Sequence, residues 1–275
     1  MATVTYFDSI DDAVDMLSKR SNINWVNPHE GKFSGASSVQ EFNDLLLYGD
    51  PVKGEKIKAM IDQHQVSLRT LGQRQQLDVA GAMPSVPHML GGDPMHMRRK
   101  KPEMINRGRI RMFVNIVVSA GVSEQQLMNR GAAIAALAYN LSTVRPVELW
   151  AIGTMDEPKK ASRPEDDYNI PCIRLAANPI DPNRIASILA HAVGARALMF
   201  NLRSVSKNEF IHWAWADYSV QCNADKFKER MTPILNLEKD DIVFPGGMLG
   251  DIASQPGKWL KDKMKQLGIL DESEA

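Results

Sequence analysis

The sequence lacks the features that would place it in a membrane or an oxidising compartment. It has only two cysteines, Cys172 and Cys222, which are far apart and form no CxxC pair, so we expect free thiols in a reducing cytoplasm. The first residues are acidic and include no basic stretch before an apolar run, so we expect no signal peptide. No apolar run approaches membrane-spanning length. The sequence therefore predicts a cytoplasmic protein with no membrane partner.

Motifs of common enzymes are missing as well. The sequence contains no GxxxxGK[ST], no GxGxxG after a strand, no HExxH, no GxSxG and no Cys/His set with zinc spacing. His191 lies in an apolar helical stretch, which favours a core histidine over a ligand. An enzyme acting on nucleic acid would need carboxylates such as Asp78, Asp93 and Asp251 to converge on metal ions. We expect no enzymatic activity, no metal and no cofactor.

Charge is balanced overall but not along the chain. Lys plus Arg number 33 and Asp plus Glu number 33, which excludes a protein that coats polyanions with its whole surface but leaves room for a local patch. Positive charge gathers between Gly91 and Met112, where only Asp93 and Glu103 oppose it. The cations of this segment are Arg98, Arg99, Lys100, Lys101, Arg107, Arg109 and Arg111.

The order of patterns along the chain predicts an α/β fold, with a largely parallel sheet flanked by helices. Residues 1–75 form a helical N-terminal region, in which a Ser38/Glu41 capping box and the Asp50-Pro51 pair mark helix starts. Residues 109–255 alternate strands and helices, with strands expected at 109–119, 147–155, 170–178 and 240–248. The main helices of this α/β core are expected at 123–142 and 182–199.

Two further regions complete this organisation, and all four belong to one compact domain. Residues 76–108 are rich in Met, Pro and Gly and are expected to be an irregular basic arm. Residues 256–275 combine a basic helix with an acidic tail that contains Asp271, Glu272 and Glu274.

The basic arm is the main candidate for a functional site. Lys and Arg clusters bind phosphates by charge-assisted hydrogen bonds and release condensed counterions. Arg107, Arg109 and Arg111 are spaced by two, so an extended segment would point them to one side, along a nucleic-acid backbone. Alternatively, the run is a solvated loop before a charged edge strand, a localisation signal or a dock for an acidic protein.

The C-terminal helix supplies a second candidate site. Lys258, Lys261, Lys263 and Lys265 surround Trp259, which we expect to be exposed enough to stack on bases. Single-strand-binding proteins combine cations with aromatic rings because each base offers a π-face and each linkage a phosphate. The acidic tail that follows is similar to the tails of bacterial single-strand-binding proteins.

With this combination of basic arm, α/β core and acidic tail, the chain resembles the single-stranded-DNA-binding RNA polymerase cofactors (Drc-type) of lytic phages. The resemblance implies a viral protein of the host cytoplasm that binds single-stranded DNA at unwound promoters and regulates transcription by recruiting a phage RNA polymerase. The arm and C-terminal helix would bind DNA, and the acidic tail or the N-terminal helices would contact protein. Self-association stays open.

A second resemblance covers only about 45 residues. The order of strand, Ser/Gly loop, helix and strand from Ile110 to Ile152 resembles a von Willebrand factor A-like unit. Val118 precedes Ser119, so Ser119 and Ser123 lack the aspartate partner that a metal site of that fold needs, and we expect no metal there. The alternative function is therefore a protein-interaction module with this fold and no metal site.

Overall fold

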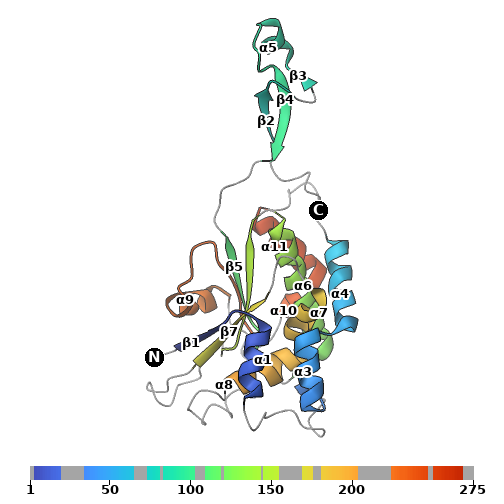
Figure 1. Cartoon of the computed structure of the whole chain (residues 1–275), viewed down its shortest axis with the longest axis vertical. Coiled ribbons are helices and arrows are strands. Elements are labelled where there is room, and N and C mark those ends of the chain that lie inside the picture. Colours follow the sequence, from blue (N-terminus) through green and yellow to red (C-terminus); the bar gives the residue numbers. More distant parts are fainter. Residues whose placement is uncertain are drawn as a thin grey trace.

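The computed structural model describes residues 3–19, 34–64, 73–80, 83–102, 109–118, 121–143, 145–154, 169–175, 181–203, 224–246 and 250–268. Its body is a five-stranded sheet with helices on both faces (Figure 1). The strands are β1 (Thr3–Phe7), β5 (Ile110–Asn115), β6 (Val147–Ile152), β7 (Asn169–Leu175) and β8 (Ile242–Phe244). The predicted α/β class is confirmed.

Sheet order is β1-β7-β6-β5-β8, and most pairs are parallel. β5 lies between β6 and β8 and runs parallel to both, with Ile110 opposite Val147 and Met112 opposite Ile242. β7 is antiparallel to β6, and β1 joins β7 in parallel. The helical N-terminal region predicted for residues 1–75 fits loosely, because its helices are preceded by β1, a short strand that pairs with residues 169–173.

Nine α-helices and two π-helical segments are described in this body. They are α1 (Ile10–Ser18), α3 (Val39–Tyr48), α4 (Pro51–Gln63), α6 (Glu124–Ser142), α7 (Pro182–Ile185), η2 (Ala186–Ala190), η3 (Val193–Leu198), α8 (Met199–Arg203), α9 (Ala224–Leu235), α10 (Gly250–Ser254) and α11 (Pro256–Gln266). None of the helices among the residues described has both the length and the hydropathy to span a bilayer.

The predicted helix starts are confirmed by their caps. Ser38 Oγ accepts the backbone N–H of Glu41 at 3.1 Å, and Asp50 Oδ1 accepts that of Lys53 at 3.0 Å. The Glu41 carboxylate reaches the backbone N–H of Ser37 at 2.7 Å rather than that of Ser38, so only half of the expected capping box forms. Such caps satisfy backbone donors that the first helical turn leaves unpaired.

Alternation along the strands divides the core between the two sheet faces. Met112 and Val114 of β5 pack in the larger cluster with α6, whereas Phe113 packs on the other face with Phe227 of α9. The larger cluster also contains side chains from the N-terminal helices and from α11, so residues 1–64 and 256–268 share the core of the sheet. Figure 1 shows α9 alone on its side of the sheet.

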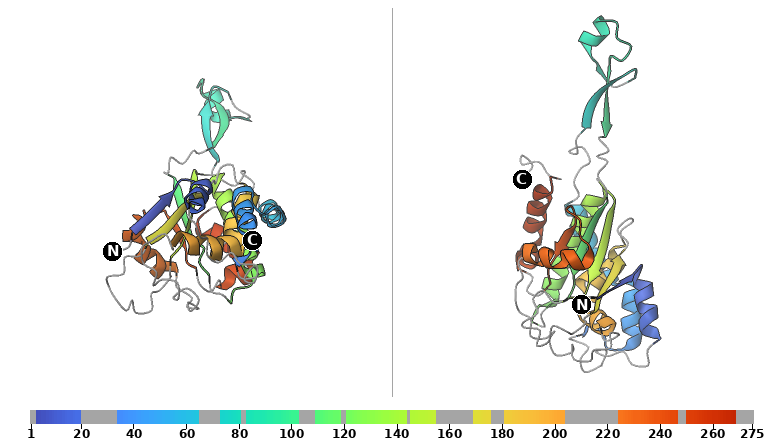
Figure 2. Two further views of the ribbon diagram at one scale, coloured as in Figure 1. Left: turned by 60° about the horizontal axis from the view of Figure 1, so that its bottom comes forward. Right: turned by 90° about the vertical axis from the view of Figure 1, so that its left-hand side faces the viewer.

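The predicted irregular arm is a folded β-unit instead. It consists of β2 (Gln73–Asp78), β3 (Met83–Pro84), α5 (Val86–Leu90) and β4 (Met97–Pro102), with strand order β2-β4-β3. Figures 1 and 2 show this unit standing away from the α/β body in every view. Pro87 lies in α5 and Gly91, Gly92 and Pro94 in the loop after it, whereas Pro84 lies in β3 and Pro102 ends β4. The basic residues form a strand.

Candidate nucleic-acid interface

Four successive cations occupy β4, which pairs antiparallel with β2. The register places Arg98 opposite Leu77, Arg99 opposite Gln76, Lys100 opposite Gln75 and Lys101 opposite Arg74. None of these opposite residues is acidic, and Arg74 repeats the positive charge. We call β2 and β4 together the basic ribbon. Arg74 belongs to it but lies outside the arm boundary predicted from the sequence.

The basic ribbon concentrates charge that the whole chain does not have. Five cations and one acid, Asp78, give it a net charge of +4, whereas the full chain is neutral. Six-residue strands are about 20 Å long, so these charges lie within a short distance. Like charges at opposite positions destabilise a strand pair, and a bound polyanion would remove that penalty.

The arginines that follow the ribbon are placed differently. Arg107 lies outside the described residues. Arg111 makes a bidentate ion pair with Asp241, with Nη2–Oδ2 at 2.5 Å and Nε–Oδ1 at 3.1 Å. Only 14% of the Arg111 side chain and 2% of the Asp241 side chain are exposed. This ion pair counts against the predicted role of Arg111 in phosphate binding, because its charge is neutralised within the fold.

Trp259 of α11 is not the exposed stacking surface that the sequence suggested. Its ring packs against the core, with its centroid 5.9 Å from that of Phe244. Among the surrounding lysines, Lys258 and Lys261 are exposed, but Lys263 is partly buried and burial lowers its pKa. Lys265 is also partly buried. The amphipathic pattern of α11 thus anchors it to the body. The acidic tail lies outside the described residues.

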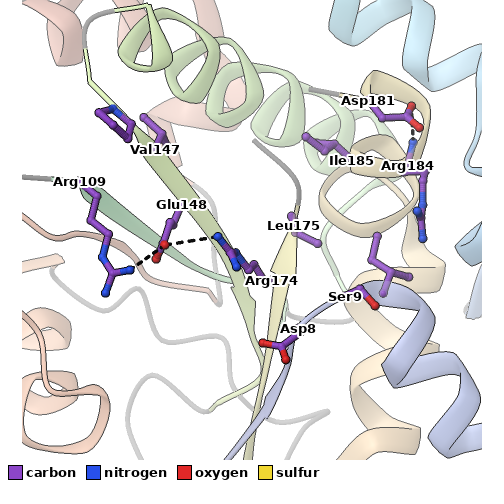
Figure 3. A pocket seen from close by; sticks show the side chains of 12 residues that line it. Asp8, Ser9, Arg109, Val147, Glu148, Arg174, Leu175, Asp181, Arg184 and Ile185 are labelled. Carbon is purple, nitrogen blue, oxygen red and sulfur yellow. Dashed lines mark hydrogen bonds and ion pairs between the residues drawn. The ribbon is translucent and has the colours of Figure 1, made fainter. Parts of the chain in front are cut away.

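A pocket of about 550 Å³ opens where β5 and β6 begin and β1 and β7 end. Figure 3 shows Arg109 and Arg174 approaching Glu148 from two sides, with N···O distances of 2.9 and 3.4 Å. The charged residues of the lining are Asp8, Glu148, Asp181, Arg109, Arg174 and Arg184. Three acids balance three arginines, so the pocket has no excess charge to attract a polyanion. Arg109 thus forms its ion pair with Glu148 of the body and does not belong to the ribbon.

The opposite sheet end, where ligands of open α/β sheets commonly bind, is closed by side chains. Arg130 is buried and donates to the carbonyls of Asn115 at 2.7 Å and Pro245 at 2.8 Å. Asn115 is bonded in turn to the backbone of Thr154. Ser119, considered above for a metal site, lies outside the described residues. In the part of the chain that the structure describes, no three His, Cys, Asp or Glu residues gather to hold a metal, and Asp78, Asp93 and Asp251 form no such group.

The core histidine predicted at position 191 is confirmed. His191 is buried, and its Nδ1 accepts the backbone N–H of Val193 at 3.1 Å. It separates η2 from η3, with Asp50 Oδ2 at 3.8 Å from its Nε2. Burial, with the nearby Lys53 charge, lowers the pKa of His191 to about 4, so it is neutral at pH 7. Lys53 is also buried and binds Glu124 at 2.5 Å, a partnership between α4 and α6 that no local motif indicates.

Comparison with known proteins assigns the chain to a family but to no function. Comparison with curated proteins found no match, and comparison with solved structures found none either. The model of one protein family, described as "Domain of unknown function (DUF7192)", matches residues 2–271. That match covers almost the entire chain, which therefore belongs to the DUF7192 family.

Proposed function

We propose that the chain binds single-stranded DNA through its basic ribbon and acts in phage transcription as a cofactor that recruits RNA polymerase to unwound promoters. The observation that carries the DNA-binding part is the net charge of +4 on a ribbon that stands away from the body, in a chain whose remaining residues sum to −4. The recruiting role is what the resemblance to Drc-type cofactors implies. The proposed place of action is the cytoplasm of the host cell.

The contrast between ribbon and body supports this choice of site. Several arginines of the body are paired with acids: Arg111 with Asp241, Arg109 with Glu148 and Arg145 with Asp240. In the ribbon, the residues opposite Arg98, Arg99, Lys100 and Lys101 are neutral or basic. A phosphate backbone would supply the missing negative charge and release its counterions on binding. Binding of this kind depends on salt and little on base sequence.

The test is fluorescence anisotropy with labelled single-stranded and duplex oligonucleotides over a range of salt concentrations. The ribbon variant carries R98Q, R99Q, K100Q and K101Q, which remove four charges and keep most of each side-chain stem. The matched control carries K56Q, K58Q, K226Q and K239Q, four exposed lysines of the body, and has the same net charge. Only the ribbon variant should lose affinity for the single strand.

The salt dependence gives the test its magnitude. Each phosphate contact to a single strand contributes about 0.7 to the slope of log affinity against log salt. Losing four contacts should lower that slope by up to about 2.8. The ratio of wild-type affinity to ribbon-variant affinity for the single strand should therefore fall by roughly 50-fold between about 50 and 200 mM salt. Equal binding by the ribbon and control variants, or no binding of the wild type at low salt, would contradict the proposal.

Failure of DNA binding would favour the alternative, a protein-interaction module with a von Willebrand factor A-like fold whose basic ribbon docks an acidic protein. Polymerase recruitment has its own test, which is co-precipitation of a phage RNA polymerase with the chain on DNA that carries an unpaired bubble. Removing residues 269–275 tests the acidic tail as the polymerase contact. Retention of polymerase by this truncated chain would assign the contact to another surface.

A further inference from the structure

The end of the arm, residues 79–96 between β2 and β4, presents an unusual number of apolar side chains to solvent. We call these residues the tip. Ten large hydrophobic side chains are exposed on the described surface, and six of them belong to the tip, with exposures from 47 to 79%. These six are Val79, Met83, Val86, Met89, Leu90 and Met95. Single exposed apolar residues are ordinary, but a cluster of this kind marks a contact surface.

The tip has a defined shape that does not depend on these side chains. The backbone N–H of Ser85 donates to His96 O at 2.6 Å, that of Met89 to Ser85 O at 2.9 Å and that of Asp93 to His88 O at 3.0 Å. Ser85 is the only buried residue among those described in the tip. Hydrogen bonds rather than apolar packing therefore hold α5 and its loop in place. The apolar groups remain available to a partner.

Charge on the ribbon identifies the kind of partner. Arg98 to Lys101 follow the tip directly in β4, so a phosphate backbone held by the ribbon would bring bases to the tip. Proteins that bend or open DNA insert Met, Leu, Pro and other apolar side chains between neighbouring bases. We propose that the tip is such a wedge and that Met89 and Leu90 of α5 insert between bases and unstack them at the edge of unwound DNA. This inference rests on the proposed DNA binding.

The single acid described in the tip is compatible with a tip that faces phosphates. Asp93 is the one acid among the described tip residues, and its Oδ1 accepts the backbone N–H of Met95 at 2.9 Å. Its Oδ2 lies 3.4 Å from His88 Nδ1. This carboxylate is thus used in forming the loop. A membrane surface is a less suitable partner because α5 has only five residues, too few for an amphipathic helix that lies in a bilayer interface.

The experiment uses DNA with a short unpaired bubble and 2-aminopurine, whose fluorescence rises on unstacking, at the edge of the bubble. The tip variant is M89S/L90S, and the matched control is V39S/V52S, which removes two exposed apolar side chains from the body. Wild type and control should raise the fluorescence equally. The tip variant should lose most of that rise, at least about threefold, while its affinity by anisotropy falls less than about threefold because the ribbon still binds phosphates.

Different results separate the wedge from the DNA binding on which it rests. DNA binding by the wild type without a rise in fluorescence would overturn the wedge and leave the proposed function standing. A tip variant that loses affinity as severely as the ribbon variant would also overturn it, since the tip would then be an anchor. Binding of anionic phosphatidylglycerol vesicles that requires Met89 and Leu90, with no unstacking, would assign the tip to membranes instead. Absence of any DNA binding would refute both proposals.

Discussion

Replacing Arg111 by methionine should destabilise the fold without weakening DNA binding by the folded protein. The Arg111 guanidinium donates twice to the Asp241 carboxylate and once to Asn236 O at 2.8 Å. The hydrogen bond to Asp241 raises the pKa of Arg111, which keeps the guanidinium charged. Methionine keeps most of the side-chain volume, which isolates the loss of charge and hydrogen bonds from the loss of packing.

The expected cost follows from the burial of the pair. Removing one partner of a buried ion pair costs about 3–5 kcal/mol because the other charge stays buried and uncompensated. Arg111 is 14% exposed, and the Asp241 carboxylate would keep one backbone N–H, that of Glu238 at 2.6 Å. The lower end, about 3 kcal/mol, is therefore expected for R111M. Loss of the guanidinium contact with Phe113, 5.6 Å from the ring centroid, adds a smaller amount.

Urea unfolding of R111M, D241N and the double variant measures this cost and the coupling between the two residues. The control is R109M, which removes an arginine of the same segment whose side chain is 58% exposed, and its cost should stay below about 1 kcal/mol. An R111M cost similar to that of R109M would refute the reasoning. So would an R111M protein of unchanged stability that binds single-stranded DNA less tightly, since Arg111 would then be a phosphate contact after all.

Three further predictions test the body of the fold. Burial lowers the pKa of His191 to about 4. Below pH 6.5, His191 therefore becomes protonated in the unfolded chain while it stays neutral in the folded chain. Stability should therefore fall as the pH drops from 6.5 towards 4, by up to about 1.4 kcal/mol per unit, and H191Q should flatten that slope in urea unfolding. G131A should lower the unfolding free energy by about 1–3 kcal/mol, since its Cβ would lie 2.6 Å from Ala190 Cβ; a gain in stability would contradict the close packing of α6 on η2. Burial raises the pKa of the Cys172 thiol, so in a Cys222→Ser variant a thiol reagent should react only after unfolding.

Local signals predicted the helices that start at a recognisable cap, whereas α9 was not predicted and non-local pairing decided β1 and the partner of Arg111. Ser38, Asp50 and Ser123 cap the expected helices because a cap depends on residues three positions apart. β1 depends on residues 169–173 to be a strand at all, so a five-residue stretch gave no sufficient signal. The ion pair of Arg111 also depends on a distant residue: the arginine is visible in the sequence, but its partner, Asp241, lies 130 residues later.

The arm shows a different reason for failure. Strand prediction depends on alternation between an apolar and a polar face, which arises when one face is buried. In the ribbon, Gln, Arg and Lys occupy successive positions, so no alternation of apolar and polar residues appears in its sequence. The basic cluster itself was found from the sequence because charge needs no periodicity to be seen. Its organisation as a ribbon, with Arg74 on the second strand, required the pairing of β2 with β4.

The positions of Arg130 and of the arm both bear on the choice of the ribbon as the proposed site. In an open α/β sheet, the crevice beyond the carboxyl ends of the parallel strands is the usual ligand site. Here the buried Arg130 guanidinium ties β5 to the segment after β8 through two backbone carbonyls. Gly246 follows, and a Cβ there would lie 2.1 Å from Val117 O, so the two segments approach too closely to admit a ligand between them. In the described residues, the ribbon carries a net charge of +4 and the tip six exposed large apolar side chains, and these are the features on which the proposed DNA binding rests.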